Sequence, residues 1–177
     1  EQNSLACGIT LNYGTDGQKE RYLTRLARGE WLGCFCLTEP HTGSDAAAIR
    51  ATARRDGDAW VLNGAKQFIT TGKEGDVAIV FAVTDPDRAS RRAGGISAFL
   101  VPTASPGFGL ESVIRMHGAV GGNEGSIVLE DVQVEPWQLV GEQHEGFRIG
   151  LLGGSIGRIY NSARAVGLGR WAIETAL

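Results

Sequence analysis

The sequence predicts an α+β fold arranged in segments: a helical end, a central antiparallel β barrel or sandwich, and then a long helix of a C-terminal helical bundle. About seven short apolar runs, separated by turn signals, occupy the middle of the chain, which is the pattern of an all-β domain. Apolar residues take up helical spacing on both sides of this region. We therefore expect three parts, residues 1–30, 31–141 and 142–177.

The first part carries signals for both ends of a helix. Thr15 followed by Gln18 is a capping box, in which each side chain satisfies a backbone amide at the start of the helix. Gly29 stands where a helix can end in the left-handed conformation that glycine tolerates.

The middle part contains turn signals that predict where its strands end. The stretch DGDAW (56–60) and the pair Asn63-Gly64 are both typical of β-hairpin turns. The stretch TDPDRASRRAGG (84–95) is polar and predicts an exposed loop.

The last part is rich in both apolar and small residues. Apolar residues recur at roughly helical spacing from Phe147 to Leu168. Glycine and alanine lie among them and allow another helix, or a ligand, to approach the backbone closely.

Composition and charge exclude several classes of protein. The 177 residues include 17 Lys and Arg against 20 Asp and Glu, a net charge of −3, so nucleic acid is not expected as a partner. The sequence contains no run of about 18 apolar residues, so no membrane span is predicted. Cys34 and Cys36 would share one face of a strand, and a buried, reduced pair is expected there. The cysteines and histidines lack metal-ligand spacing, so no metal site is expected.

The two ends of the sequence predict a fragment of a longer chain. It begins EQNSLACGI, without an initiator methionine or a signal peptide, and it ends GRWAIETAL inside a helical pattern.

Motifs of three common enzyme classes are absent from the sequence. The Gly-rich GAVGGNEG (118–125) precedes an expected strand, whereas a dinucleotide-binding loop precedes a helix. TTGKE (70–74) lacks the spacing of a P-loop, and no Gly-x-Ser-x-Gly occurs. Nicotinamide Rossmann enzymes, P-loop NTPases and α/β-hydrolases are therefore disfavoured.

The stretch CLTEPHTGSD (36–45) places small hydrogen-bonding residues directly after a predicted strand. Pro40 removes a ladder donor and holds Glu39 extended. Gly43 permits a tight turn, and Ser44 with nearby amides can form an anion-binding nest. From these residues alone, a plain turn and a ligand site both remain open.

A second stretch, NGAKQFITTG (63–72), places an aromatic residue beside hydroxyls near a strand end. Phe68 alone suits either the core or a cofactor platform. Together, CFCLTEPHTGSD and NGAKQFITTG resemble two signature segments of the acyl-CoA dehydrogenase family. The segments around them, including SIGRIYNSARAVGLGRW, are similar to that family too, so the resemblance covers nearly the whole chain.

The resemblance implies FAD as cofactor and α,β-dehydrogenation of an acyl-CoA thioester, with electrons passed on to an electron-transfer flavoprotein or similar acceptor. Thr38 would hydrogen-bond the pyrimidine end of the flavin, Thr70 would reach its N5/O4 edge, and Phe68 would cover a ring face where the family usually has Trp. Ser44 would serve the pyrophosphate or the neighbouring CoA. The flavin-binding positions implied are Phe35, Cys36, Leu37, Thr38, Gly43, Ser44, Phe68, Ile69 and Thr70.

The same resemblance implies substrate contacts on the last helix. Ser44, Ser155 and Arg158 would contact the acyl-CoA, with Ser155 in place of the family's aspartate. A subgroup carries the catalytic base immediately before the arginine, but Gly157 fills that position here and has no proton acceptor. We therefore expect the base beyond Leu177, and this chain alone to be inactive.

Alternatives remain open beside this interpretation. One is an acyl-CoA oxidase or flavin monooxygenase on the same fold, and another is a non-catalytic β-domain binding module. Glu39 is expected to brace its loop rather than to act as the base. The resemblance further implies a homo-tetramer or dimer that acts in fatty acid β-oxidation, in the bacterial cytoplasm or the mitochondrial matrix.

Overall fold

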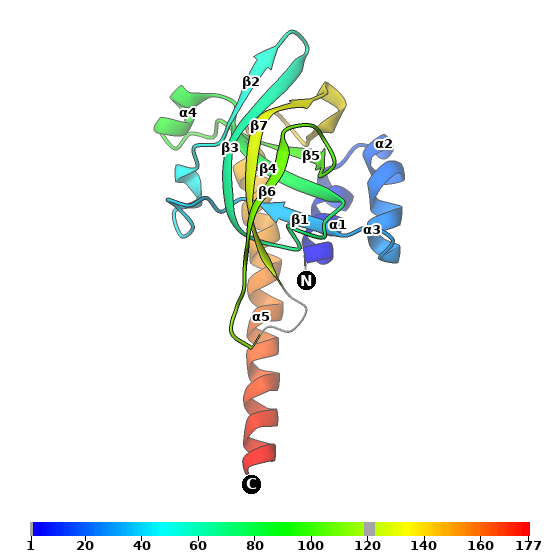
Figure 1. The fold of residues 1–177 in the computed structure, drawn as a ribbon, viewed down its shortest axis with the longest axis vertical. Coiled ribbons are helices and arrows are strands. Elements are labelled where there is room, and N and C mark those ends of the chain that lie inside the picture. Colours follow the sequence, from blue (N-terminus) through cyan, green and yellow to red (C-terminus); the bar gives the residue numbers. More distant parts are fainter. Residues whose placement is uncertain (1, 119–122) are drawn as a thin grey trace.

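A computed structural model describes residues 2–118 and 123–177 (Figure 1). The helices of this part are α1 (Gln2–Tyr13), α2 (Asp16–Gln18), α3 (Thr24–Arg28), α4 (Pro86–Ser90) and α5 (Gly146–Ala176), with a π-helical turn at Lys19–Leu23 and 3-10 turns at Ala46–Ala48 and Pro136–Gln138. The strands are β1 (Gly33–Cys36), β2 (Thr52–Asp56), β3 (Ala59–Thr70), β4 (Val77–Val83), β5 (Ile96–Pro102), β6 (Phe108–Ile114), β7 (Glu124–Val134) and β8 (Leu139–Val140). This order confirms the predicted α+β fold.

Both helix signals of the first part are confirmed. Thr15 Oγ1 accepts from the backbone N–H of Gln18 at 3.2 Å, and Gln18 Oε1 accepts from the N–H of Thr15 at 2.9 Å. Gly29 ends α3 with φ +70°. Gln18 also donates to the backbone carbonyls of Trp137 and Leu139, which ties the helical end to the edge strand β8 and the turn before it.

The described strands form one mixed sheet in the order β6-β7-β3-β2-β4-β5-β8, with β1 paired to β4. Most neighbours are antiparallel, as predicted, but β1 runs parallel to β4, and β2 meets β4 in parallel at one position. The β2–β3 hairpin turns at residues 57–58, which confirms the turn predicted in DGDAW.

Side chains of β4 alternate between two cores. Ala78, Val80 and Ala82 face a core that also holds residues of β1, β2, β3, β5 and β7, so the sheet wraps around it. Ile79 and Phe81 face a second core, which is closed by α1, α3 and the start of α5. Burial on both faces explains why the β4 and β5 sequences are almost continuously apolar.

The hairpin turn predicted at Asn63-Gly64 is wrong, because the pair lies inside β3, at a register shift against β7. Gly64 takes φ +144°, and an added Cβ would lie 2.7 Å from Ala51. Asn63 donates to the Asp131 carboxylate at 2.9 Å and accepts from the Asp131 N–H. Glycine is needed here for close approach of two strands, and not for reversal of the chain.

The polar segment 84–95 is exposed as predicted for much of its length, but it contains the short helix α4. Asp85 caps this helix by accepting from the Arg88 N–H at 3.0 Å. In the Gly-rich stretch 118–125, β7 begins at Glu124, whereas residues 119–122 lie outside the described part.

The long helix α5 starts against the sheet and extends well away from it toward the C-terminus (Figure 1). Its first turns are buried at Ile149 and Gly150, and its far half is exposed, with Val166 at 73% and Trp171 at 63%. In the described residues, no helix combines the length and apolar character needed to cross a membrane. The division into domains at residues 30 and 141 stays a prediction.

Candidate functional site

The loop after β1 is held by a tight turn and by one buried carboxylate. Glu39 and Thr42 exchange backbone hydrogen bonds of 2.9 and 3.1 Å. The Glu39 side chain accepts from the backbone N–H groups of Arg50 and Ala51, at 2.6 and 3.0 Å, and from Lys66 Nζ at 2.7 Å. With 4% of its surface exposed and its oxygens engaged, Glu39 braces the loop, which confirms that prediction.

Lys66 is the buried partner of this carboxylate. Its side chain is fully buried, and Nζ also donates to the Leu37 carbonyl at 3.3 Å. Burial lowers the pKa of Lys66, while the Glu39 carboxylate acts against that shift. The pair therefore fixes the end of β1 against the middle of β3, because breaking it would leave a buried charge unpaired.

One backbone hydrogen bond joins the two predicted site segments. The Gln67 N–H donates to the Thr38 carbonyl at 2.9 Å, just beyond the end of β1 and near the end of β3. Phe68 is the next residue, has φ +56° and lies at a second register shift between β3 and β7. This irregularity turns Phe68 outward, with 58% of its surface exposed, while Ile69 is 1% exposed and packs into the core.

The hydroxyl groups of the predicted flavin-binding residues differ in their hydrogen-bond partners. Thr70 Oγ1 donates to the Glu124 carboxylate, with distances of 2.9 and 2.8 Å to its two oxygens. Within residues 2–118 and 123–177, no hydrogen bond involves the hydroxyl of Thr38 or of Ser44. The Thr38 and Ser44 hydroxyls are therefore available to a ligand, whereas the Thr70 proton is already engaged.

These residues fit one edge and one face of a flavin. The ring system needs a flat apolar surface, which the outward Phe68 ring offers, and hydrogen-bonding groups along its edge, which Thr38 and Thr70 offer. Because the Thr70 hydroxyl already donates its hydrogen bond to Glu124, its oxygen would serve a ligand as a hydrogen-bond acceptor. The fit rests on an exposed aromatic ring in a left-handed backbone conformation. Such a conformation costs stability, and strained residues of this kind cluster at functional sites.

Several other predicted flavin-binding positions have side chains that are buried or packed against the protein. Cys36 is fully buried, so it can offer a ligand only backbone atoms, as can Ile69. The Phe35 ring packs on Phe81, with ring centroids 4.9 Å apart. Leu37 is half-buried against the second core, and Gly43 lies exposed beside the Thr38 methyl group.

Cys34 and Cys36 are buried on one face of β1 as free thiols, which confirms that expectation. A hydrogen bond to Cys36, together with burial, raises the pKa of Cys34 well above its ordinary value. Cys34 Sγ lies 3.7 Å from the Val77 carbonyl oxygen. Both thiols thus serve the packing of the sheet.

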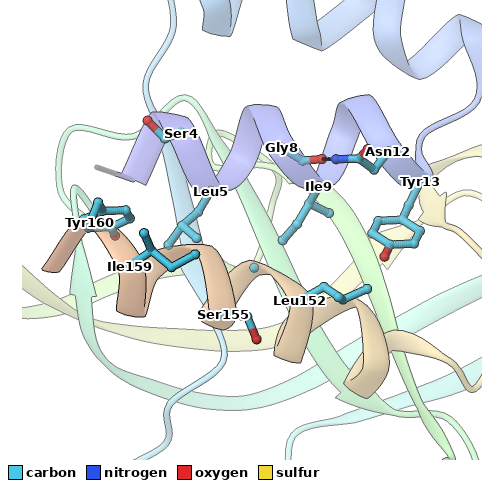
Figure 2. A pocket seen from close by; sticks show the side chains of 11 residues that line it. Ser4, Leu5, Gly8, Ile9, Asn12, Tyr13, Leu152, Ser155, Ile159 and Tyr160 are labelled. Carbon is cyan, nitrogen blue, oxygen red and sulfur yellow. Dashed lines mark hydrogen bonds between the residues drawn. The ribbon is translucent and has the colours of Figure 1, made fainter. Parts of the chain in front are cut away.

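A cavity of about 310 Å³ lies between α1 and α5. Figure 2 shows Leu5 and Ile9 pointing from α1 toward α5, where Leu152 and Ile159 form the opposite wall. The wall also includes Ser155, whose hydroxyl donates back to the Leu151 carbonyl at 3.0 Å. The cavity is therefore apolar in its walls, with a few polar groups at its edges.

The other predicted substrate residues lie apart from this cavity. Arg158 is exposed and does not line it. Gly157 is buried beside Tyr160 and carries no side chain that could take a proton. Ser44 lines a second hollow, of about 230 Å³, together with the first turns of α5.

Sequence reasoning missed two charged residues of the site. Glu124 stands at the edge of the Gly-rich stretch, and its contact with Thr70 spans 54 positions. Arg92 stands in the segment predicted as a polar loop, and it pairs with Asp45 across 47 positions. Neither residue has a local signal, because both contacts depend on the folded sheet.

Comparison with known proteins places these features in a family. The profile described as "Acyl-CoA dehydrogenase, middle domain" matches residues 34–132. An acyl-CoA dehydrogenase of Bacillus subtilis is 40% identical over 98% of this chain and 45% of its own length. The human short-chain specific acyl-CoA dehydrogenase, mitochondrial, is 40% identical over 99% of this chain and 42% of its own length.

A solved structure agrees with the sequence matches. The glutaryl-CoA dehydrogenase of Mycobacterium smegmatis, in complex with FADH2, superposes with a TM-score of 0.72 at 38% identity, over 85% of this chain and 36% of that one. The chain thus spans less than half the length of the relatives it matches. The order of its elements, its two signature segments and these matches agree: the chain belongs to the acyl-CoA dehydrogenase family.

Proposed function

We propose that this chain supplies the flavin-binding part of an FAD-dependent enzyme that dehydrogenates an acyl-CoA thioester between its α and β carbons. The observation that carries the proposal is the hydrogen bond from Gln67 to Thr38, because it brings both signature segments together beside the exposed Phe68 ring. FAD, when bound, supplies the acceptor for a hydride from the substrate. Membership of the family and the FADH2 named for the Mycobacterium smegmatis structure support FAD as the cofactor.

Each site residue then has a defined task. Phe68 covers one face of the ring system and excludes water from it. The Thr38 hydroxyl donates a hydrogen bond to the pyrimidine end, where negative charge develops on reduction. Because its own proton is donated to Glu124, the Thr70 oxygen would accept a hydrogen bond at the N5/O4 edge from the N–H that N5 carries in the reduced flavin.

The cavity between α1 and α5 is proposed to take the acyl chain, because its walls are apolar. Ser155 stands at its edge, and Arg158 is proposed to contact the thioester from outside the cavity. Ser44 is proposed to contact the CoA portion in the second hollow. Because Gly157 has no proton acceptor, the base is proposed to lie in a part of the relatives' length that this chain does not span.

The remaining expectations follow family membership. Electrons are proposed to pass to an electron-transfer flavoprotein or a similar protein, and the full-length protein is proposed to be a homo-tetramer or dimer. Its location is proposed to be the bacterial cytoplasm or the mitochondrial matrix, since the matched relatives include a Bacillus protein and a mitochondrial one.

The test compares the full-length protein with residues 1–177. Each is reconstituted with FAD and given a short-chain acyl-CoA and an electron-accepting dye. The full-length protein is expected to reduce the dye, and residues 1–177 are expected not to, because they hold no base. Turnover by residues 1–177 would overturn the placement of the base. Hydrogen peroxide formation in place of dye reduction would favour an oxidase.

A further inference from the structure

A bidentate ion pair joins two loops above the start of α5. Arg92 Nη1 lies 3.0 Å from Asp45 Oδ1, and Nη2 lies 2.6 Å from Oδ2. Asp45 ends the first signature segment, whereas Arg92 belongs to the connection between β4 and β5. Both side chains are exposed, at 47% for Asp45 and 64% for Arg92. The fork geometry is the one that guanidinium adopts with a carboxylate or with a phosphate.

The pair stands at the opening of the hollow of about 230 Å³ that Ser44 lines. Phe147 and Leu151 of α5 form its apolar wall, together with Ile96 of β5. The Ser44 hydroxyl has no partner among the described residues, so it is available to a ligand as a donor. A hollow with an apolar wall, a hydroxyl and a guanidinium at its mouth suits a long ligand with an anionic end.

The other arginines of this connection already have partners within the protein. Arg88 lies 4.0 Å from Glu145, and its Nε donates to the Ala93 carbonyl at 3.1 Å. Arg91 Nε donates to the Asp87 carbonyl at 3.3 Å and does not line the hollow. Among the described lining residues, Arg92 is thus the cation, and Asp45 is the acid that faces it.

Arg92 is held in position by a backbone conformation that residues other than glycine rarely adopt. Its φ is +56°, and its N–H donates to the Ala89 carbonyl at 3.0 Å. This left-handed turn follows α4 directly. A guanidinium that is positioned by the backbone, yet paired only with an exposed carboxylate, can exchange that partner at little cost.

We propose that Arg92 binds a phosphate group of the CoA thioester at the mouth of this hollow, and that Asp45 is the internal carboxylate which it releases on binding. The inference rests on the proposed function and adds a residue that fixes specificity for CoA over thioesters without phosphate. Asp45 opposes binding in two ways, because it occupies the guanidinium fork and because its charge repels phosphate.

The test uses Arg92→Gln and Asp45→Asn in the full-length flavoprotein. Arg92→Gln is expected to raise the KM for acyl-CoA about tenfold, the loss typical of one charge-assisted contact. For the N-acetylcysteamine thioester of the same acyl group, which has no phosphate, KM is expected to stay unchanged. Asp45→Asn is expected to lower the KM for acyl-CoA by about threefold, because the competing carboxylate is gone. Arg91→Gln is the matched control and is expected to change neither.

Truncated thioesters identify the phosphate. If the Arg92→Gln effect persists with dephospho-CoA thioester, the contact is to the pyrophosphate, and if it disappears, the contact is to the 3′-phosphate. Calorimetric measurement of the equilibrium affinity for free CoA gives the same comparison of variants without turnover.

Opposite signs for the two variants separate binding from a structural clamp. If Asp45→Asn raises KM as Arg92→Gln does, or if Arg92→Gln affects both thioesters equally, the inference is overturned. If the wild-type protein binds CoA and Arg92→Gln binds it with the same affinity, the inference is overturned but the proposed function stands. Wild-type protein that neither binds CoA nor oxidises acyl-CoA overturns both.

Discussion

The buried Lys66 ammonium lies 2.7 Å from a carboxylate oxygen of Glu39, and this pair joins the strand end of the first signature segment to the strand of the second. Both residues lie in the two signature segments and have ionisable side chains, which in the sequence suggest catalytic groups. In the structure they are buried and bonded to the backbone, so they shape the site without facing it.

Removing one member of this pair is expected to destabilise the protein strongly. Glu39→Gln leaves the Lys66 charge buried without its counter-charge, and should lower the free energy of unfolding by about 3–5 kcal/mol. Urea unfolding of the full-length protein measures this. Glu39→Gln combined with Lys66→Met is the control, and should recover much of the loss. A loss below about 1 kcal/mol for Glu39→Gln would show that the pair does not hold the loop.

Phe68→Ala is expected to separate cofactor binding from stability. The ring is 58% exposed, so its removal should change the free energy of unfolding of the apoprotein by no more than about 0.5 kcal/mol. Affinity for FAD should fall by about tenfold, because one ring face loses its cover. Fluorescence quenching of FAD measures this affinity. Ile69→Ala, at the next position but buried, should instead cost about 2–5 kcal/mol of stability.

Glu124→Gln is expected to make the bound flavin easier to reduce. The carboxylate stands behind the Thr70 hydroxyl, and its negative charge opposes the charge that reduction adds. Removing about 1 kcal/mol of repulsion corresponds to a rise of about 20 mV in a two-electron potential. Spectroelectrochemical titration measures the potential, with Thr70→Val as the companion variant. A lower potential in Glu124→Gln would contradict the assigned arrangement.

The Asp45 carboxylate is expected to remain ionised at lower pH than an ordinary aspartate. Hydrogen bonds from Arg92 lower the pKa of Asp45. The pair therefore contributes stability above the unfolded pKa, about 3.9, and loses it as the pH falls through the lowered folded value. Carboxyl carbon NMR titration should show the pKa of Asp45 returning toward its ordinary value in Arg92→Gln. An unchanged titration would mean that the pair does not form in solution.

Local signals predicted the fold well where the contacts themselves are local. The capping box of Thr15 and Gln18 spans three positions, and Gly29 ends its own helix, so both could be read from the sequence. The role of Asn63-Gly64 could not be predicted, because this residue pair occurs both in hairpin turns and where two strands approach closely. Ala51, on a neighbouring segment, decides between the two.

The site could be predicted only in its motifs. A hydrogen bond between the Thr38 and Gln67 backbones brings the two motifs together, but the exposure of Phe68 and the burial of Ile69 depend on the register shift between β3 and β7. Arg92 and Glu124 join the site through partners about 50 positions away, and no periodicity or spacing reports such contacts.

The most direct test of the central claim is an anaerobic titration of the full-length protein, reconstituted with FAD, by a short-chain acyl-CoA. The account predicts that the visible absorbance of oxidised flavin bleaches as the thioester is added, and that Phe68→Ala weakens the cofactor's retention. A protein that does not retain FAD, or whose bound flavin stays oxidised in excess acyl-CoA, would contradict it.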